Sequence, residues 1–406
     1  MSSEKGLKVY YATAADVELL GAPRSIDIPI VKYLNELGCE VSWFGINIDN
    51  CNDTCKDITS LRYSKFYKFL IRLKNKILRE LNIQTSEAQK INAQKKFDEW
   101  LSALLIERKH DIDENLIFIG RAVSSELSFK TIKKYGGKCV LHSQWMHPET
   151  QKRILKQAFN DLNLDYPQIL SERVRVQLRE IELCDKIWCI SNLVYDSYLQ
   201  NGVPKEKLLL CPLGVDTNVF KPASTSPKQS SDKYNIVFVG NINIEKGAHV
   251  LLNALALGEI SNCQLILNGA VADYFESFLQ EISNKLKKLN VEVVVESGFP
   301  LKNLQKADLF ILPSLHESFG LVVLEAMACG LPVIVTDQVG ASDHIIPGEN
   351  GFIVPANSVE KLSEKILYFY NDRNQRDSFG KKSFALSQDL SWPRVTERFI
   401  ESVIRI

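Results

Sequence analysis

Residues 307–355 read ADLFILPSLHESFGLVVLEAMACGLPVIVTDQVGASDHIIPGENGFIVP. The run LFIL is typical of a buried strand, and Pro313 ends it. Residues 314–318 then have the composition of a polar loop, and residues 319–329 have the pattern of a helix closed by Gly330. The apolar run VIVT follows directly. We therefore expect a strand–loop–helix–strand unit from a parallel α/β sheet.

The same alternation of short apolar runs and longer helical patterns extends along the whole chain. Twelve runs have strand character: 8–12, 40–44, 116–119, 138–142, 186–190, 207–211, 235–239, 264–267, 291–296, 309–312, 333–336 and 352–354. A first helix is expected over 25–37, after a loop that holds Gly21, Pro23 and Arg24. The polar stretch 224–233 (STSPKQSSDK) separates two such series. The pattern predicts two doubly wound, Rossmann-like α/β domains that face a central cleft.

Composition excludes several classes of protein. The chain has 406 residues, 45% hydrophobic and 24% charged, with 49 Lys plus Arg against 49 Asp plus Glu. This balance is typical of a globular protein and gives no argument for nucleic acid as a partner. The first residues, MSSEKGLKVYYATAA, lack the apolar core of a signal peptide, and no run is long enough to span a membrane. We expect a cytoplasmic protein.

The cysteines and one basic segment leave alternatives open. Nine scattered cysteines indicate buried free thiols, although Cys51 and Cys55 could pair or bind a metal. Residues 62–79 (RYSKFYKFLIRLKNKILR) hold seven Lys or Arg and no acidic residue, with an apolar stripe at helical spacing. This is a basic amphipathic helix pattern. It fits a helix packed on the first domain, or a helix that binds an anionic membrane surface, which would place the protein on the inner face of the membrane.

The expected loop and helix of residues 314–329 carry candidate chemistry. A helix that begins near Phe319 presents free amides of Phe319, Gly320 and Leu321, which suit phosphate oxygens. Glu317 falls in the loop and Glu325 on the helix. Eight positions of separation place the two carboxylates at different depths of one site.

This stretch resembles the E-x7-E signature of family-4 glycosyltransferases, a retaining group with the two-domain GT-B fold. The matching text is PSLHESFGLVVLEAMACGLPVIVTD and GENGFIV. The resemblance implies that Glu325 binds the ribose hydroxyls of a nucleotide and that Glu317 lies by the donor sugar. It also implies that the amides of Ser318, Phe319, Gly320 and Leu321 contact the pyrophosphate or the sugar.

A second matching segment is FVGNINIEKG at 238–247. A strand ends at Gly240, and Lys246 is expected to start a helix. A cation there could neutralise the charge that builds on a departing diphosphate. The family usually has an arginine directly after the glycine, where this chain has Asn241. Arg24 or Arg121 could supply the missing cation.

A third match, CPLGVDTNVFKP at 211–222, resembles the segment that joins the two domains. There Gly214 would form a tight turn that Asp216 and Phe220 fix. By the same resemblance, residues 1–213 form an acceptor-binding domain and 214–384 a nucleotide-sugar-binding domain. A helix within 385–406 packs back on the first domain. Residues 298–304, which begin with Gly298, are expected to form the base pocket together with Asn268 and Gly269.

The acceptor side of the site is less marked. The family often has a Gly-Gly loop after the first strand, for which Gly21-Ala22 is a degenerate candidate, and a histidine at a later strand end. His142 and His147 both fit that position. His142 is the candidate catalytic group, while Gly21, Arg24, Arg121 and His147 are candidates for contact with the acceptor.

The resemblance implies transfer of a sugar, with retention of configuration, from a UDP- or GDP-sugar to a saccharide or lipid-linked saccharide. No cofactor or metal is expected, because no DxD motif follows a strand. The alternative is a degenerate, sugar-nucleotide-binding subunit without turnover, which Asn241 would explain. Epimerisation of a sugar nucleotide or phosphorolysis on the same fold is disfavoured by the E-x7-E stretch.

Overall fold

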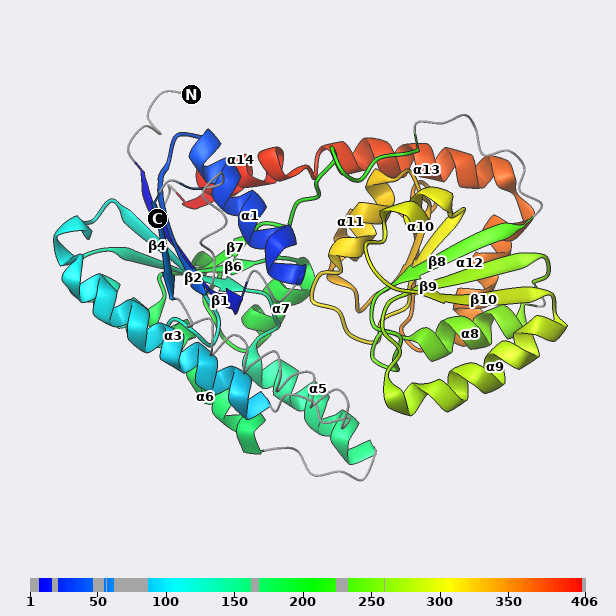
Figure 1. Ribbon diagram of the computed structural model, residues 1–406, viewed down its shortest axis with the longest axis horizontal. Coiled ribbons are helices and arrows are strands. Elements are labelled where there is room, and N and C mark those ends of the chain that lie inside the picture. The colour runs from blue at the N-terminus through cyan, green and yellow to red at the C-terminus, as the bar shows by residue number, and fades with distance from the viewer. Residues whose placement is uncertain are drawn as a thin grey trace. The chain divides into compact units, whose positions relative to one another are not determined.

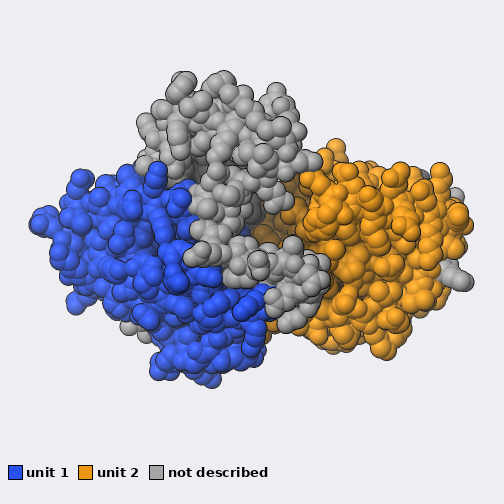
Figure 2. All heavy atoms as spheres, turned by 90° about the horizontal axis from the view of Figure 1, so that it is seen from below, with its two compact units in different colours: residues 1–190, 194–211, 396–406 blue, residues 191–193, 212–395 orange. Residues whose placement is uncertain are grey.

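The computed structural model describes residues 7–16, 21–46, 55, 57–61, 87–161, 168–223, 233–258 and 260–403. The chain divides into two compact units, shown in Figure 2. Unit 1 comprises residues 1–190, 194–211 and 396–406, and unit 2 comprises residues 191–193 and 212–395. The basic segment 62–79, Cys51 and residues 224–232 of the expected linker lie outside the described residues.

Unit 1 contains a seven-stranded sheet of order β3-β2-β1-β4-β5-β6-β7, in which all neighbours run parallel. Its strands are β1 (Lys8–Asp16), β2 (Glu40–Ile46), β3 (Asp57–Leu61), β4 (Leu116–Arg121), β5 (Lys138–Ser143), β6 (Lys186–Cys189) and β7 (Leu208–Leu210). Its helices are α1 (Gly21–Glu36), α3 (Glu87–Glu107), α4 (Glu126–Lys134), α5 (Pro148–Asp161), α6 (Gln168–Leu183) and most of α7 (Asn192–Gln200).

Unit 2 contains a six-stranded parallel sheet of order β10-β9-β8-β11-β12-β13. Its strands are β8 (Tyr234–Val239), β9 (Cys263–Asn268), β10 (Val291–Glu296), β11 (Leu309–Leu312), β12 (Val333–Thr336) and β13 (Gly351–Val354). Its helices are α8 (Ala248–Leu257), α9 (Glu276–Lys288), α10 (Leu301–Lys306), α11 (Leu321–Ala328), α12 (Val359–Asn371) and α13 (Arg373–Gln388). Helices α8, α9 and α12 form one group and α11 and α13 another, on opposite sides of the sheet (Figure 1).

The predicted fold class is confirmed, because both sheets are parallel and doubly wound. All twelve expected runs form strands, with ends shifted by a few residues at most. The sequence missed β3, whose residues DITSL include only two large apolar side chains. This strand lies at the edge of the sheet, where one long side is unpaired and an apolar run is not required.

The C-terminal helix α14 (Trp392–Val403) contributes its first residues to unit 2 and its last residues to unit 1. Within unit 1, the Phe399 and Trp188 rings pack together with their centroids 4.0 Å apart. Within unit 2, a Cβ on Gly214 would stand 2.7 Å from Trp392, so the glycine is required by close packing on this tryptophan. Gly214 does not lie in a turn, in contrast to the expected tight turn. Asp216 does fix the following turn, since its carboxylate accepts a hydrogen bond from the Asn218 amide at 3.0 Å.

The described cysteines are buried free thiols, as the sequence predicts. They are Cys39, Cys55, Cys139, Cys184, Cys189, Cys211, Cys263 and Cys329. The Cys55 thiol donates a hydrogen bond to the Val41 carbonyl at 3.1 Å. Among the described helices, none combines the length and the apolar character needed to cross a membrane.

Candidate functional site

The sheet of unit 2 has one point at which the strand order reverses. From β8 the chain proceeds outward through β9 and β10 on one side, and β11 begins the series on the other side. Adjacent loops at the carboxyl ends of β8 and β11 therefore leave in opposite directions. Ligands of doubly wound sheets bind at such a point. The two segments that the sequence singled out, 240–247 and 313–320, are these loops.

Close packing of the two loops depends on Gly247. Its φ of +71° lies in the left-handed region, and a Cβ there would stand 1.9 Å from the Pro313 carbonyl oxygen. The Leu315 amide also donates a hydrogen bond to the Glu245 carbonyl at 2.8 Å. A side chain at position 247 would force the loops apart. Glycine therefore brings residue 246 against the second loop.

The side chains of Lys246 and Glu317 form an ion pair across this point. Lys246 Nζ lies 2.5 Å from Glu317 Oε2, with side-chain exposures of 21% and 23%. The Lys246 amide donates a hydrogen bond to Asn243 Oδ1 at 2.8 Å, and the Glu317 amide donates to the Gln338 carbonyl at 2.9 Å. Both charged groups thus have a fixed backbone and a side chain that reaches solvent. Lys246 lies in the turn before α8, two residues earlier than the helix that the sequence predicted it to start.

Helix α11 begins next to this pair, at Leu321 and not at the predicted Phe319. Gly320 precedes it with a left-handed φ of +87°, and a Cβ there would stand 3.1 Å from Val339. The Ser318 carbonyl accepts a hydrogen bond from Ser191 Oγ at 2.7 Å. A helix begins with amides that lack intrahelical partners and carries a partial positive charge there. This end of the site therefore suits an anion.

Glu325 lies on the buried side of the same helix. It is only 9% exposed, whereas Glu317 in the loop is partly open to solvent. Burial raises the pKa of Glu325 to about 7, because the charged carboxylate loses hydration. The two glutamates thus lie at different depths, as expected from their spacing.

A second polar group lies at the carboxyl ends of β9 and β10. Asn303 Nδ2 donates hydrogen bonds to Asn268 Oδ1 at 2.8 Å and to Glu296 Oε2 at 2.7 Å. Asn268 Nδ2 donates to the Gly298 carbonyl at 3.1 Å. This network fixes the backbone around Gly298, whose φ is +101°. The sequence included Asn303 in a range but did not single it out.

Gly240 and Asn241 begin the loop that leads to Lys246. A Cβ on Gly269 would stand 1.9 Å from the Gly240 carbonyl oxygen, so the loops after β8 and β9 are also closely packed. Asn241 is exposed. At this position the chain places an uncharged side chain.

Unit 1 has its own reversal of strand order, between β1 and β4. The Asp27 carboxylate of α1, fully buried, accepts hydrogen bonds there from Tyr11 Oη at 2.6 Å and Thr13 Oγ1 at 3.1 Å. Arg121, the last residue of β4, lies with Nη1 3.1 Å from the same carboxylate. This ion pair is more buried than the pair in unit 2, with exposures of 13% for Arg121 and 0% for Asp27.

His142 is part of this cluster. It lies opposite Arg121 in the register of β4 and β5, and its ring stacks on Trp188 with centroids 4.2 Å apart. Its Nδ1 is 3.5 Å from Tyr11 Oη. Burial and the nearby Arg121 guanidinium hold the pKa of His142 well below its usual range. The ring is therefore neutral at neutral pH.

The other candidates in unit 1 lie elsewhere. His147 is buried, packs edge-on against Tyr198, and its Nδ1 accepts a hydrogen bond from the Glu149 amide at 3.3 Å in the first turn of α5. These contacts make His147 a helix-capping residue. Its predicted contact with the acceptor substrate stays a prediction. Gly21 and Arg24 lie within the first turns of α1. The prediction of a loop with a degenerate Gly-Gly pair around them is wrong, because helix α1 begins at Gly21, four residues before the expected start at residue 25.

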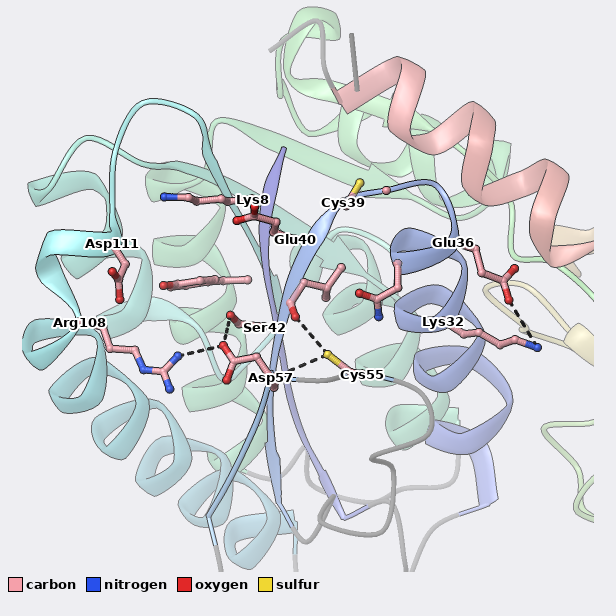
Figure 3. A pocket seen from close by; sticks show the side chains of 14 residues that line it. Lys8, Lys32, Glu36, Cys39, Glu40, Ser42, Cys55, Asp57, Arg108 and Asp111 are labelled. Atoms are coloured by element: carbon pink, nitrogen blue, oxygen red, sulfur yellow. Dashed lines mark hydrogen bonds and ion pairs between the residues drawn. The ribbon is translucent and has the colours of Figure 1, made fainter. Parts of the chain in front are cut away.

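A polar pocket lies at the opposite end of the strands of this sheet, beside the amino ends of β1, β2 and β3 (Figure 3). Its charges are largely paired with one another. Arg108 Nη1 lies 3.2 Å from Asp57 Oδ2, which also accepts a hydrogen bond from Ser42, and Lys32 lies 3.9 Å from Glu36. Ligands of doubly wound sheets bind at the carboxyl ends of the strands, so this pocket is not the candidate site. Within the described ranges, no three His, Cys, Asp or Glu residues form a group that could hold a metal ion.

Sequence reasoning missed Tyr11 and Asp27. These two residues have no motif around them, and their partners Arg121 and His142 are about a hundred positions away. The one indication in the sequence was a charged residue, Asp27, on the inner face of the first helix. Without knowledge of the strand order, it could not be matched to a partner.

Comparisons with known proteins show what the chain is similar to in sequence and fold. Residues 221–385 match the family model described as glycosyl transferases group 1. The D-inositol 3-phosphate glycosyltransferase of Arthrobacter sp. is 29% identical over 208 residues, which cover 48% of this chain and 49% of that protein. The capsular polysaccharide biosynthesis glycosyltransferase CapM of Staphylococcus aureus is 29% identical over 182 residues, covering 44% and 46% of the two chains. The chain thus matches about half the length of these relatives.

Solved structures resemble the whole chain in fold. Sucrose-phosphate synthase from Thermosynechococcus elongatus superimposes with a TM-score of 0.73 at 19% identity, over 98% of both chains. The Anabaena HepE structure, in complex with UDP and glucose, gives a TM-score of 0.68 at 17% identity, over 98% of this chain and all of that one.

Two doubly wound parallel domains with this likeness define a GT-B fold. Residues 221–385, which contain the ion pair and helix α11, match the family model of the group 1 glycosyl transferases. No single member of the family is distinguished by these matches.

Proposed function

We propose that the chain is a retaining glycosyltransferase that moves a sugar from a UDP- or GDP-sugar to a saccharide or lipid-linked saccharide, without a metal ion. One observation carries the proposal. The Lys246–Glu317 pair lies at the strand-order reversal of unit 2, directly before the amino end of α11. Two similarities support it: the match of residues 221–385 to the group 1 glycosyl transferases, and the fold shared with Anabaena HepE, whose structure contains UDP and glucose.

The chemistry follows from the charges. Departure of a nucleoside diphosphate concentrates negative charge on its phosphates, and fixed positive groups stabilise the transition state more than the ground state. Lys246 and the first amides of α11 are two such groups. Glu317 holds the ammonium group of Lys246 in place before the donor binds, and then accepts hydrogen bonds from the donor sugar. Glu325, at the deeper position, accepts hydrogen bonds from the ribose hydroxyls.

Retention needs no carboxylate nucleophile in this scheme. The leaving phosphate departs from the face that the acceptor attacks, and its own oxygen takes the acceptor proton. Glu317 is ion-paired with Lys246, which lowers its nucleophilicity. The two-carboxylate chemistry of glycoside hydrolysis is therefore the wrong template here.

The primary test is release of nucleoside diphosphate by the full chain from a panel of UDP- and GDP-sugars, with and without saccharide acceptors. Release from one donor, stimulated by an acceptor and abolished in Lys246→Ala, is the expected result. Tight donor binding with no release under any condition would instead identify a binding subunit.

Two further measurements test the finer statements. Proton NMR of the first product should show the anomeric configuration of the donor, and an inverted product contradicts retention. Chelation with EDTA should leave the rate unchanged, whereas a loss restored by added Mg²⁺ or Mn²⁺ contradicts metal independence.

The lipid-linked acceptor is motivated by the basic amphipathic sequence at 62–79. Polybasic segments bind anionic lipid surfaces at about 1 kcal/mol for each Lys or Arg near the surface. Replacing its seven basic residues with Gln should abolish sedimentation with phosphatidylserine vesicles and leave transfer to a soluble acceptor intact. Unchanged vesicle binding would remove this part of the proposal.

A further inference from the structure

The cluster at the strand-order reversal of unit 1 contains a chain of three buried side chains. Asp27 Oδ1 accepts a hydrogen bond from Tyr11 Oη at 2.6 Å, and Tyr11 Oη lies 3.5 Å from His142 Nδ1. All three side chains are at most 1% exposed. A short hydrogen bond to a charged acceptor fixes the position of its proton. The Tyr11 hydroxyl proton therefore lies on the Asp27 side.

This direction determines what His142 can do. With its proton directed at Asp27, the Tyr11 oxygen presents a lone pair to the histidine. A lone pair on Nδ1 would repel it, whereas an Nδ1–H would donate to it. Burial and the adjacent Asp27 carboxylate raise the pKa of Tyr11 well above its usual range, so the hydroxyl stays protonated. The Nδ1–H form of the ring is the one that matches its surroundings.

The other ring nitrogen is buried and unpaired. Among the residues that the structure describes, His142 Nε2 has no hydrogen-bond partner. A buried polar atom without a partner costs about 1–3 kcal/mol, so each one calls for an explanation. Trp188 stacks on the ring and prevents it from rotating toward a different partner.

We propose that Asp27 and Tyr11 are positioning residues that hold His142 as the Nδ1–H tautomer, so that Nε2 is a fixed acceptor for a hydroxyl group of a carbohydrate substrate. The tautomer rests on the contacts of unit 1 alone. The hydroxyl ligand rests on the proposed glycosyl transfer. Arg121 completes the arrangement, because its ion pair holds the Asp27 carboxylate in place from the other side.

The test is a long-range ¹H–¹⁵N correlation spectrum of the full chain with ¹⁵N-labelled histidine at neutral pH, which distinguishes the two tautomers by the shifts of each ring nitrogen. The chain has six histidines, so the signal of His142 is assigned by its loss in His142→Gln. We expect a protonated Nδ1 and a bare Nε2. A protonated Nε2, or a doubly protonated ring, overturns the proposal.

The Tyr11→Phe variant keeps the ring and removes the hydroxyl group. His142 should then change to a mixture richer in the Nε2–H tautomer, while the other five histidines keep their shifts and report an intact fold. The matched control is Tyr198→Phe, which removes another buried tyrosine hydroxyl of unit 1 that hydrogen-bonds to Ser143 at 2.8 Å. It should leave the His142 tautomer unchanged. If the tautomer of His142 is the same in Tyr11→Phe as in the wild type, the proposed positioning by Tyr11 is overturned.

Kinetics separate this inference from the proposed function. If the chain is a glycosyltransferase, Tyr11→Phe should lower kcat by about 10–100-fold, the range typical for loss of an orienting partner, with little change in donor KM. Tyr198→Phe should not. An Nδ1–H tautomer in a chain with no transferase activity contradicts the proposed function but not the positioning of His142 by Tyr11 and Asp27. An active enzyme with the Nε2–H tautomer contradicts that positioning alone.

Discussion

The two units place charged groups at the same topological position but treat them differently. In unit 2 the pair Lys246–Glu317 projects from loops beyond the strands, and each side chain is about one-fifth exposed. In unit 1 the pair Arg121–Asp27 joins a strand end to a helix and is almost completely buried. An exposed pair can exchange its partner for a ligand at low cost, whereas a buried pair cannot. The first arrangement suits a group that must contact charge on a substrate, and the second suits a fixed support.

The sharpest test of this contrast is the loss of Lys246, the partly exposed cation of unit 2. Lys246→Ala should lower the transfer rate by about 10²–10³-fold, the usual effect of removing one preorganised group that stabilises charge in a transition state. The free energy of unfolding should change little, because the side chain is partly solvated. The rate is measured by release of nucleoside diphosphate, and stability by urea unfolding.

The control is Lys361→Ala, which removes another lysine of unit 2 that forms an ion pair, with Glu364 at 3.0 Å and 61% exposed. It should retain the wild-type rate. A Lys246→Ala enzyme of wild-type activity would show that the pair is structural.

Loss of Asp27, the buried anion of unit 1, should in contrast lower the free energy of unfolding substantially. Asp27→Ala leaves the Arg121 charge and the hydroxyl groups of Tyr11 and Thr13 without their acceptor, and should cost about 3 kcal/mol of unfolding free energy. Urea unfolding followed by tryptophan fluorescence measures it. The double variant Asp27→Asn, Arg121→Gln should recover part of this stability, and no recovery would argue against an ion pair in solution.

Glu325 gives a prediction with a defined sign in pH. Burial raises its folded-state pKa to about 7, above the value in the unfolded chain, so the folded protein binds more protons. Stability therefore falls as the pH rises through this range. Glu325→Gln removes the titration. Its stability relative to the wild type should increase by about 2–3 kcal/mol between pH 5 and pH 8. A difference that does not vary with pH would contradict the buried state of this carboxyl group.

The smallest expected effect concerns the contact between the two loops of unit 2. Gly247→Ala introduces a left-handed alanine and a clash with the Pro313 carbonyl, and should cost about 1–3 kcal/mol of unfolding free energy together with a loss of transfer activity. Gly348→Ala is the matched control, because Gly348 has a similar φ of +88° with open space around it. It should cost about 1–2 kcal/mol or less and leave activity unchanged. Equal effects of the two variants would remove the argument from close packing.

The sequence predicted much of the fold but only one half of the polar arrangement. Its apolar runs identified every strand of the described residues except β3, because buried parallel strands require such runs and an edge strand does not. Lys246, Glu317 and Glu325 were predicted as site residues because they lie within two segments that resemble the family's motifs. Asp27 and Tyr11 were not, because their partners become neighbours only through the strand order β1-β4-β5. Helix boundaries at Gly21 and Leu321 also differed, since propensity does not determine where a helix ends.

The buried thiols allow the unfolding of each unit to be followed separately, because a cysteine can be labelled only when the unit around it unfolds. Six of the eight described cysteines belong to unit 1, and Cys263 and Cys329 belong to unit 2. Burial raises the pKa of both Cys263 and Cys329 to about 12, so neither reacts with an alkylating reagent while folded. Pulsed alkylation followed by peptide mass spectrometry would therefore time the unfolding of the two units separately, with no added probe. Binding of a sugar nucleotide to unit 2 should slow labelling at Cys263 and Cys329 first.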